Sequence, residues 1–284
     1  MICPNELRDV YAAGRLIPFI GAGVSMSVSW KTSSSGGRDQ VMRGPSWSEL
    51  VNEAARRLGF EDPELARMRG TDLQILEYYR IKEHGSFYGL TNWLVTEMRP
   101  PDDALRNSPI HRELARLALC NMFYTTNYDN FVERAFFLHG RKYRRVAIEA
   151  HMAAPNDPDI CEVIKFHGDL ENPDEMVLSE RDYERRLTLE TVMDYRFRAD
   201  LLGRVVLFLG YSFRDWNVSY LFRLMNERFH NLPGSPSGRR AYITVSDPSD
   251  FEVQLFRARN IEVIPIPGRA QTDEIATLLA EMQH

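Results

Sequence analysis

Cysteine is scarce in this chain of 284 residues, which contains Cys3, Cys120 and Cys161. The three are scattered, odd in number and form no Cys-x-x-Cys pair, so they predict neither a disulfide framework nor a four-cysteine zinc site. An excess of positive charge is also missing, because the formal net charge is -5. A protein whose main task is to grip nucleic acid needs a basic surface, so we expect no strong direct nucleic-acid binding.

A targeting segment and a long apolar run are missing as well. The first ten residues, MICPNELRDV, lack a basic stretch followed by an apolar core. No apolar run reaches the ~18–20 residues that a membrane helix requires. We therefore expect a cytoplasmic protein without a membrane segment. The chain is 44% hydrophobic and 26% charged, which is ordinary for a globular protein with a sizeable core.

Six short apolar runs alternate with helical segments. Each run is rich in β-branched and aromatic residues and is closed by Gly, Asn, Asp or Pro, which is typical of buried parallel strands. The alternation predicts an α/β fold with a Rossmann-like, doubly wound parallel sheet of six strands. The runs are Leu16–Ile20, Asn121–Thr125, Glu162–Phe166, Val205–Leu209, Ala241–Val245 and Ile261–Ile266.

The alternation is interrupted between residues 46 and 116, where helical periodicity occurs without a convincing strand. Ser46 followed by Glu49 predicts a capping box at the start of this region. We expect a single domain over residues 1–284 that carries a helical insert over residues 46–116. We also expect a mobile loop over Ser27–Gly44 and a surface turn over Asn231–Arg240, because both are rich in turn residues. The basic run Arg141, Lys142, Arg144 and Arg145 is predicted to be a solvated surface segment.

The first chemical motif is Gly21-Ala22-Gly23-Val24-Ser25, directly after the first predicted strand. Glycines at such a place let the backbone turn tightly and approach a pyrophosphate. The third glycine of the usual dinucleotide fingerprint is missing, since Met26 stands there. A purely structural turn is the alternative interpretation.

The second motif, Thr125-Thr126-Asn127-Tyr128-Asp129, follows the second predicted strand. Polar residues at the carboxyl ends of parallel strands line the ligand crevice in this fold class. The Asn127 amide both donates and accepts, so it can orient a water or a ribose hydroxyl. Alternatively, Asn127 and Asp129 cap the next helix.

Two further motifs end the third and fourth predicted strands. His167, in Phe166-His167-Gly168, can accept a proton near pH 7 if its imidazole is neutral. In Gly210-Tyr211-Ser212, Gly210 permits close backbone approach and Ser212 can bond a ribose or phosphate. Because all four motifs lie at strand ends, we expect them to converge on one edge of the sheet.

In this order, GAGVS, TTNYD, FHG and GYS resemble the core motifs of the sirtuins over about residues 10 to 266. The resemblance implies that NAD is bound and that the motif residues hold it. By that resemblance Asn127 and Asp129 face the nicotinamide ribose, and His167 is the catalytic base. The NAD contacts implied are Gly21, Ala22, Gly23 and Ser25 at the phosphates, Thr126 in the second motif, and Gly210 and Ser212 at the adenosine half.

The sequence departs from the sirtuin deacylases in two places. Their Pro-Asp-Phe-Arg stretch has no counterpart after the first motif, and the region after His167 holds no cysteine for a zinc module. The chain is therefore similar to the sirtuin-like branch of bacterial antiphage defence proteins, in which Pro-x-Trp-x-x-Leu (Pro45, Trp47 and Leu50 here) opens a helical insert. That resemblance implies NAD as substrate, no zinc, and hydrolysis to ADP-ribose and nicotinamide.

Regulation is expected because uncontrolled NAD loss would kill the host. The resemblance implies a homo-oligomer and a HerA-type hexameric ATPase or DNA translocase as partner. Two other functions stay open at this point. One is an NAD-dependent protein deacylase or ADP-ribosyltransferase, and the other is a non-enzymatic sensor of NAD or ADP-ribose.

Overall fold

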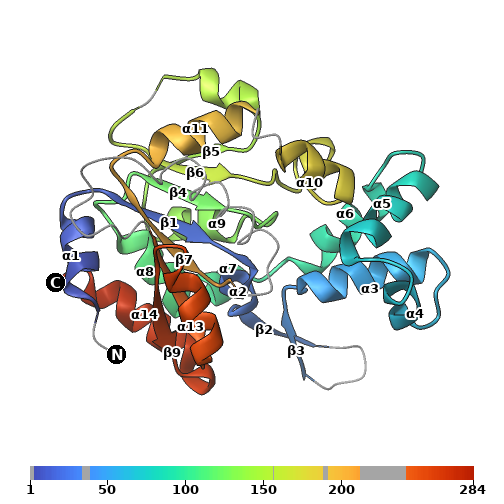
Figure 1. Cartoon of the computed structure of the whole chain (residues 1–284), viewed down its shortest axis with the longest axis horizontal. Helices are drawn as coiled ribbons and strands as arrows, with labels where there is room; N and C mark the ends of the chain where they lie inside the picture. Colours follow the sequence, from blue (N-terminus) through green and yellow to red (C-terminus); the bar gives the residue numbers. More distant parts are fainter. Residues whose placement is uncertain (1–2, 34–38, 156, 188–190, 212–240) are drawn as a thin grey trace.

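A parallel sheet of seven strands lies at the centre of the molecule (Figure 1). The computed structural model describes residues 3–33, 39–155, 157–187, 191–211 and 241–284. Within these residues the strand order is β5-β6-β4-β1-β7-β8-β9, and every neighbouring pair is parallel. The strands are β1 Leu16–Ile20, β4 Met122–Thr125, β5 Tyr143–Val146, β6 Cys161–Lys165, β7 Val205–Leu209, β8 Ala241–Ser246 and β9 Ile261–Ile266.

The topology is that of the Rossmann fold with one added edge strand. When β5 is left out and the other six strands are numbered along the chain, the order reads 3-2-1-4-5-6. These six are the strands predicted from the sequence, so the predicted fold class is confirmed, with seven strands in place of six. The strand order reverses between β1 and β7, and ligands of such sheets bind at the carboxyl ends of the strands at this switch point.

The seventh strand, β5, comes from the basic run that was expected to be a solvated surface segment. That expectation is wrong, because Arg144 pairs with Glu162 of β6 and Arg145 pairs with Asp169 at 3.3 Å. Arg141 lies over the rings of Phe123 and Phe136. Charged residues on an edge strand also discourage pairing with another chain.

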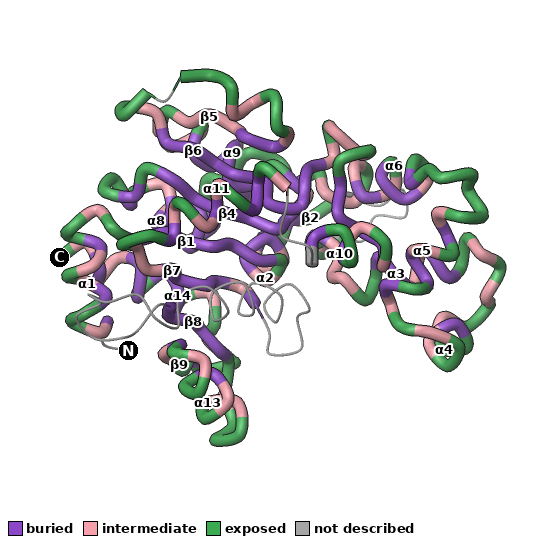
Figure 2. The backbone as a smooth tube through the Cα atoms, turned by 45° about the horizontal axis from the view of Figure 1, so that its top comes forward, coloured by how far each residue is buried: buried purple, intermediate pink, exposed green. Residues whose placement is uncertain are grey.

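Helices cover both faces of the sheet, and Figure 2 shows the buried strands between exposed helical surfaces. One face packs Phe19, Tyr124 and Phe208 against α11 and α13. The other packs Ile20 and Phe123 against α1, α8, α9 and α14. The bounds are α1 Asn5–Ala12, α2 Ala22–Met26, α7 Asp102–Arg106, α8 Pro109–Arg116, α9 Phe131–Leu138, α10 Glu180–Leu187, α11 Val192–Asp200, α13 Asp250–Arg257 and α14 Gln271–Glu281, with short 3-10 turns at Glu149–Ala153, Pro173–Glu175 and Gly268–Ala270.

A second group of helices lies beside the sheet in Figure 1 and has its own apolar cluster. Its members are α3 Trp47–Arg57, α4 Pro63–Arg67, α5 Asp72–Lys82 and α6 Tyr88–Glu97. The predicted capping box of Ser46 and Glu49 is confirmed at the start of α3. The last helix of the expected insert, α8, packs against α9 and α14 on the sheet. The division of the chain at residues 46–116 stays a prediction.

The segment expected to be a mobile loop contains a β-hairpin. Strands β2 Ser29–Ser33 and β3 Asp39–Arg43 pair antiparallel, so the expectation of a loop is wrong for these residues. Trp30 explains why this segment forms a hairpin, because its side chain is buried in a cluster with Leu105 and Phe131. The predicted turn at Asn231–Arg240 lies outside the described residues. Among the helices that the structure describes, none is long and apolar enough to cross a bilayer.

Candidate functional site

The first and fourth motifs interlock through their glycines. The backbone N–H of Gly21 donates to the carbonyl of Leu209 at 2.8 Å, and that of Gly23 donates to Gly210 at 2.9 Å. Gly210 has a φ of +73°, and a Cβ there would lie 2.5 Å from the backbone nitrogen of Val24. Only glycine allows this approach, so the tips of β1 and β7 are held as one unit.

The Asn127 side chain is fixed at the tip of β4. Its Nδ2 donates to the Gly21 carbonyl at 3.0 Å and to Ser25 Oγ at 2.9 Å. Its backbone N–H donates to Thr125 Oγ1, which in turn donates to the carbonyl of Ile20. Both amide hydrogens are used, so Oδ1 is the amide atom that can accept a hydrogen bond from a water or a hydroxyl.

Ser25 connects this amide to the carboxylate of Asp129. Ser25 Oγ donates to Asp129 Oδ2 at 2.8 Å, and Asp129 Oδ1 accepts from the backbone N–H of Phe131 at 3.0 Å. The N-cap of α9 is Asn130, which makes no side-chain cap bond, so Asp129 is not the cap itself but binds the first N–H of the helix and also orients Ser25. All three side chains are buried, so the chain Asn127–Ser25–Asp129 is a rigid part of the site.

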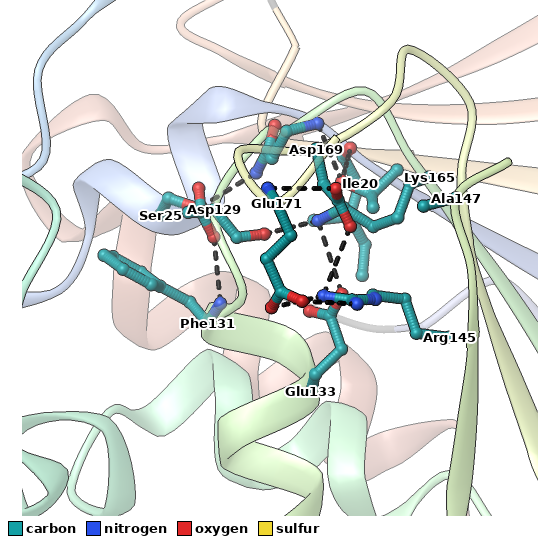
Figure 3. A network of polar contacts seen from close by, with 12 residues as sticks. Ile20, Ser25, Asp129, Phe131, Glu133, Arg145, Ala147, Lys165, Asp169 and Glu171 are labelled. Carbon is teal, nitrogen blue, oxygen red and sulfur yellow. Dashed lines mark hydrogen bonds and ion pairs between the residues drawn. The ribbon is translucent and has the colours of Figure 1, made fainter. Parts of the chain in front are cut away.

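A buried ion pair of Lys165 and Glu133 contacts the Asp129 segment, as Figure 3 shows. Lys165 of β6 donates to the backbone carbonyl of Asp129 and lies 3.4 Å from Glu133 Oε1. Both charged side chains are almost fully buried. Burial raises the pKa of Glu133, and the nearby Lys165 opposes that rise. The pair therefore stabilises the site only as long as both partners are present.

A cavity of about 560 Å³ opens in front of Asn127. Its floor comes from the first two motifs, and its walls come from the helices of the second group, with Tyr183 of α10 at one side. The cavity lies at the carboxyl ends of β1 and β4, next to the switch point between β1 and β7. The lining residues are Ala22, Ser25, Pro45, Ser46, Trp47, Ser48, Leu50, Thr71, Asp72, Leu73, Leu94, Met98, Thr126, Asn127, Tyr128, Asp129 and Tyr183.

His167 follows β6 but does not line this cavity. Its side chain is 1% exposed, and neither ring nitrogen has a hydrogen-bond partner. Burial, together with the positive charge of Arg186, lowers the pKa of His167 well below its ordinary value. The buried imidazole is therefore neutral at pH 7.

The predicted site residues thus fall into four groups. Ala22, Ser25, Thr126, Asn127 and Asp129 line the cavity. Gly21, Gly23 and Gly210 pack against one another beneath it. His167 lies apart from the cavity, and Ser212 lies outside the described residues. The roles assigned to these residues stay predictions.

Two tyrosines at the site are without a predicted role. Tyr211 Oη donates to the Ile20 carbonyl at 3.0 Å and shares a 2.8 Å hydrogen bond with Thr126 Oγ1, so it ties the second motif to the fourth. Tyr211 stands inside the GYS motif. A tyrosine next to a strand-end glycine could have indicated a side chain that bonds the neighbouring strand tips. Tyr183 stands on a charged helix far from any motif, and nothing in the local sequence marks it.

The fold and the cavity together define a Rossmann-type α/β protein with a cavity at the carboxyl ends of its central strands. The sequence model of the SIR2-like domain matches residues 121–264, just over half of the chain. The chain therefore belongs to the SIR2-like domain family. Among the residues that the structure describes, no three His, Cys, Asp or Glu side chains are grouped so that they could hold a metal ion.

Curated relatives carry names that concern NAD and defence. An NAD(+) hydrolase ThsA of Enterococcus faecium is 30% identical over 221 residues, which cover 75% of this chain and 40% of that protein. An NAD(+) hydrolase ThsA of Bacillus cereus (strain MSX-D12) is 28% identical, covering 86% of this chain and 47% of that protein. Defense-associated sirtuin 2 of Bacillus subtilis is 23% identical, and the match covers 88% of this chain and 22% of that protein.

This chain spans less than half the length of these curated relatives. A solved structure described as "Structural Basis for the Mechanism and Regulation of Sir2 Enzymes" aligns with 99% of this chain and 98% of its own, at 12% identity and a TM-score of 0.45.

Proposed function

We propose that this chain hydrolyses NAD at the bond between nicotinamide and ribose. The observation that carries the proposal is the Asn127 amide, which is held by Gly21 and Ser25 with its oxygen available beside a 560 Å³ cavity. The SIR2-like family and the relatives named NAD(+) hydrolase support the choice of substrate.

The proposed reaction adds water across the glycosidic bond. Water attacks the anomeric carbon of the ribose, the bond to the pyridinium nitrogen breaks, and neutral nicotinamide leaves. Asn127 positions the water or the ribose diol, Asp129 holds Ser25 and through it the amide, and His167 takes the proton that the water loses. A single positioned base contributes about a hundred- to ten-thousand-fold in rate, and positioning of the water and ribose supplies much of the rest.

We assign the remaining predicted residues to NAD binding. Gly21, Ala22, Gly23 and Ser25 are proposed to face the phosphates, and Gly210 is proposed to face the adenosine half. Thr126 is held by Tyr211 at the same edge of the sheet, which supports a place next to the ribose.

The direct test is chromatography of NAD after incubation with the pure protein. Hydrolysis gives ADP-ribose and nicotinamide in equal amounts without any peptide. We expect Asn127→Ala and His167→Ala each to lower the rate at least about a hundredfold while the folded state is kept. The matched controls are Asn130→Ala and His84→Ala, which remove an exposed amide and an exposed imidazole. Full activity in both site variants would refute the assignment, and bound but unconsumed NAD would indicate a sensor.

We further propose that the chain acts in the cytoplasm as an NAD-depleting effector of antiphage defence. The relative named as a defence-associated sirtuin supports this role. Control by a homo-oligomer and by a HerA-type ATPase is proposed from the family resemblance. Size-exclusion chromatography with and without such an ATPase, followed by the NAD assay on each peak, tests both.

A further inference from the structure

The imidazole of His167 is closed off from the cavity in which the reaction is proposed to occur. Its side chain is 1% exposed, both ring nitrogens lack a hydrogen-bond partner, and it is absent from the cavity wall. A general base must come within hydrogen-bond reach of the proton that it accepts, directly or through one water. A buried polar ring without a partner is also costly, so this arrangement calls for a reason.

Tyr183 of α10 touches both the imidazole and the cavity. Its ring centroid lies 5.5 Å from that of His167, and the two planes meet at 83°, so one ring presents its edge to the other. Tyr183 also lines the cavity together with Asn127. The tyrosine ring packs with Leu73 and Val177, and it is 5% exposed. The side chain therefore occupies the place through which the cavity would reach His167.

Polar contacts hold α10 in this place at both ends. On the side of the helical group, Arg80 of α5 pairs with Asp182 at 2.9 Å, and Gln74 donates to Glu180 at 3.0 Å. On the side of the sheet, Arg186 donates to the Phe166 carbonyl at 2.6 Å. The contacts with α5 are partly exposed to solvent, and such pairs typically contribute only about 0–1 kcal/mol each. The polar contacts with α5 therefore add little to the apolar packing of Tyr183 in holding this side of α10.

We propose that α10 is a hinged cover over the site and that Tyr183 is the residue that closes the path between the cavity and His167. The proposal rests on the role given to His167 in the proposed function. In this structure the cover is closed. Displacement of Tyr183, together with α10, joins the imidazole to the cavity and places base, amide and substrate in one space. NAD turnover is then limited by opening of α10, in the manner of other active-site lids.

The first test measures access to His167 and does not depend on catalysis. Diethyl pyrocarbonate modifies neutral imidazoles that solvent can reach, and mass spectrometry of peptides reports each histidine separately. In the wild-type protein His167 should react slowly, like the fully buried His111, while the exposed His84 reacts quickly. Tyr183→Ala should speed modification of His167 by about tenfold, since a local opening then costs less. Tyr183→Phe keeps the ring and should keep the protection.

A second variant guards against misfolding of Tyr183→Ala. Arg80→Ala removes the ion pair with Asp182 and should also raise the modification of His167. Its matched control is Arg116→Ala, which removes a 3.0 Å pair with Glu113 on α8, away from the cover. The proposal is overturned if wild-type His167 reacts as fast as His84. It is also overturned if Tyr183→Ala and Arg80→Ala, both still folded, leave His167 as protected as His111.

NAD hydrolysis then separates this proposal from the one on which it rests. We expect Tyr183→Ala to raise the basal rate, and Tyr183→Ala combined with His167→Ala to abolish it. If His167→Ala alone leaves hydrolysis intact, the base assignment fails, while the modification experiment still decides whether α10 is a cover. If His167→Ala abolishes hydrolysis but Tyr183→Ala gives neither faster turnover nor faster modification, the cover fails alone.

Discussion

The amide of Asn127 donates to the hydroxyl of Ser25 across 2.9 Å, although the two residues are 102 positions apart in the chain. This one hydrogen bond joins the loop after β1 to the tip of β4. It also continues into the carboxylate of Asp129, so three side chains share one polar chain. The orientation of the amide thus depends on the Ser25 hydroxyl and, through it, on the Asp129 carboxylate.

Loss of Ser25 should therefore damage stability and activity together. Ser25→Ala leaves Asn127 Nδ2 and Asp129 Oδ2 each one partner short in a buried place, and an unsatisfied group typically costs about 1–3 kcal/mol. We expect a lower free energy of unfolding in urea and slower NAD hydrolysis. Ser27→Ala is the control, because its hydroxyl bonds only to the nearby Val24 carbonyl at a half-exposed position. Equal effects of the two variants would contradict the prediction.

The approach of the two loops at Gly210 predicts a large effect of one methyl group. Gly210→Ala should lower the free energy of unfolding for two reasons. The positive φ disfavours alanine by roughly 1–2 kcal/mol, and the clash of the new Cβ with Val24 costs roughly 1–3 kcal/mol more. Gly203→Ala isolates the first part, because Gly203 has a φ of +75° and nothing within 4 Å of the new Cβ. Urea unfolding should rank Gly210→Ala well below Gly203→Ala, and a similar stability for both would show that the loops can move apart.

The buried pair of Lys165 and Glu133 should behave non-additively. Lys165→Met leaves the Glu133 carboxylate buried without its ion-pair partner. We expect this variant to lower the free energy of unfolding by about 3–5 kcal/mol. Lys165→Met combined with Glu133→Leu removes both charges and should be less destabilised than Lys165→Met alone. A double-mutant cycle by denaturant unfolding measures the coupling. Additive effects would mean that the two charges do not depend on each other.

Stability should fall as the pH drops below about 6.5, in part because of His111. Burial, with a small contribution from His139, lowers the pKa of His111 from 6.5 to about 4. Between these values the unfolded chain holds a proton that the folded chain lacks, so stability is full above the unfolded pKa and is lost on acidification. One such group contributes a slope of up to about 1.4 kcal/mol per pH unit.

Unfolding curves at a series of pH values measure that slope. His167 adds to it in the same direction, since its pKa is also lowered by burial. Glu133 acts in the opposite direction, because its raised pKa removes stability as the pH rises through the unfolded value of about 4.5. His111→Gln should flatten the loss of stability between pH 6.5 and 4. An unchanged slope would show that His111 is not its source.

Local sequence was enough to predict the central sheet and the floor of the cavity. Buried parallel strands are short and apolar on both faces, and the six predicted runs all became strands for that reason. The strand-end residues Ser25, Asn127 and Asp129 meet because the carboxyl ends of parallel strands share an edge.

Features that depend on distant partners could not be predicted in this way. The sequence of β5 is polar, so it does not resemble a buried strand. It joins the sheet because its arginines pair with carboxylates of Glu162 on β6 and of Asp169 after it. The hairpin of β2 and β3 depends on Trp30 packing against Leu105, which lies far along the chain. The position of Tyr183 depends on contacts of α10 with α5, about a hundred residues earlier. Periodicity and turn chemistry hold no information about such encounters.

The route of the chain around β1 sets how this scaffold can diversify. The polypeptide leaves the sheet at its central strand, builds the hairpin and the group α3–α6, and returns to the neighbouring strand β4. One wall of the cavity is thus a detour between two adjacent strands, whereas the floor comes from the segments that directly follow β1 and β4. Lengthening or exchanging that detour reshapes ligand recognition and leaves the hydrogen-bonded ladder intact, so selection can act on one without disturbing the other.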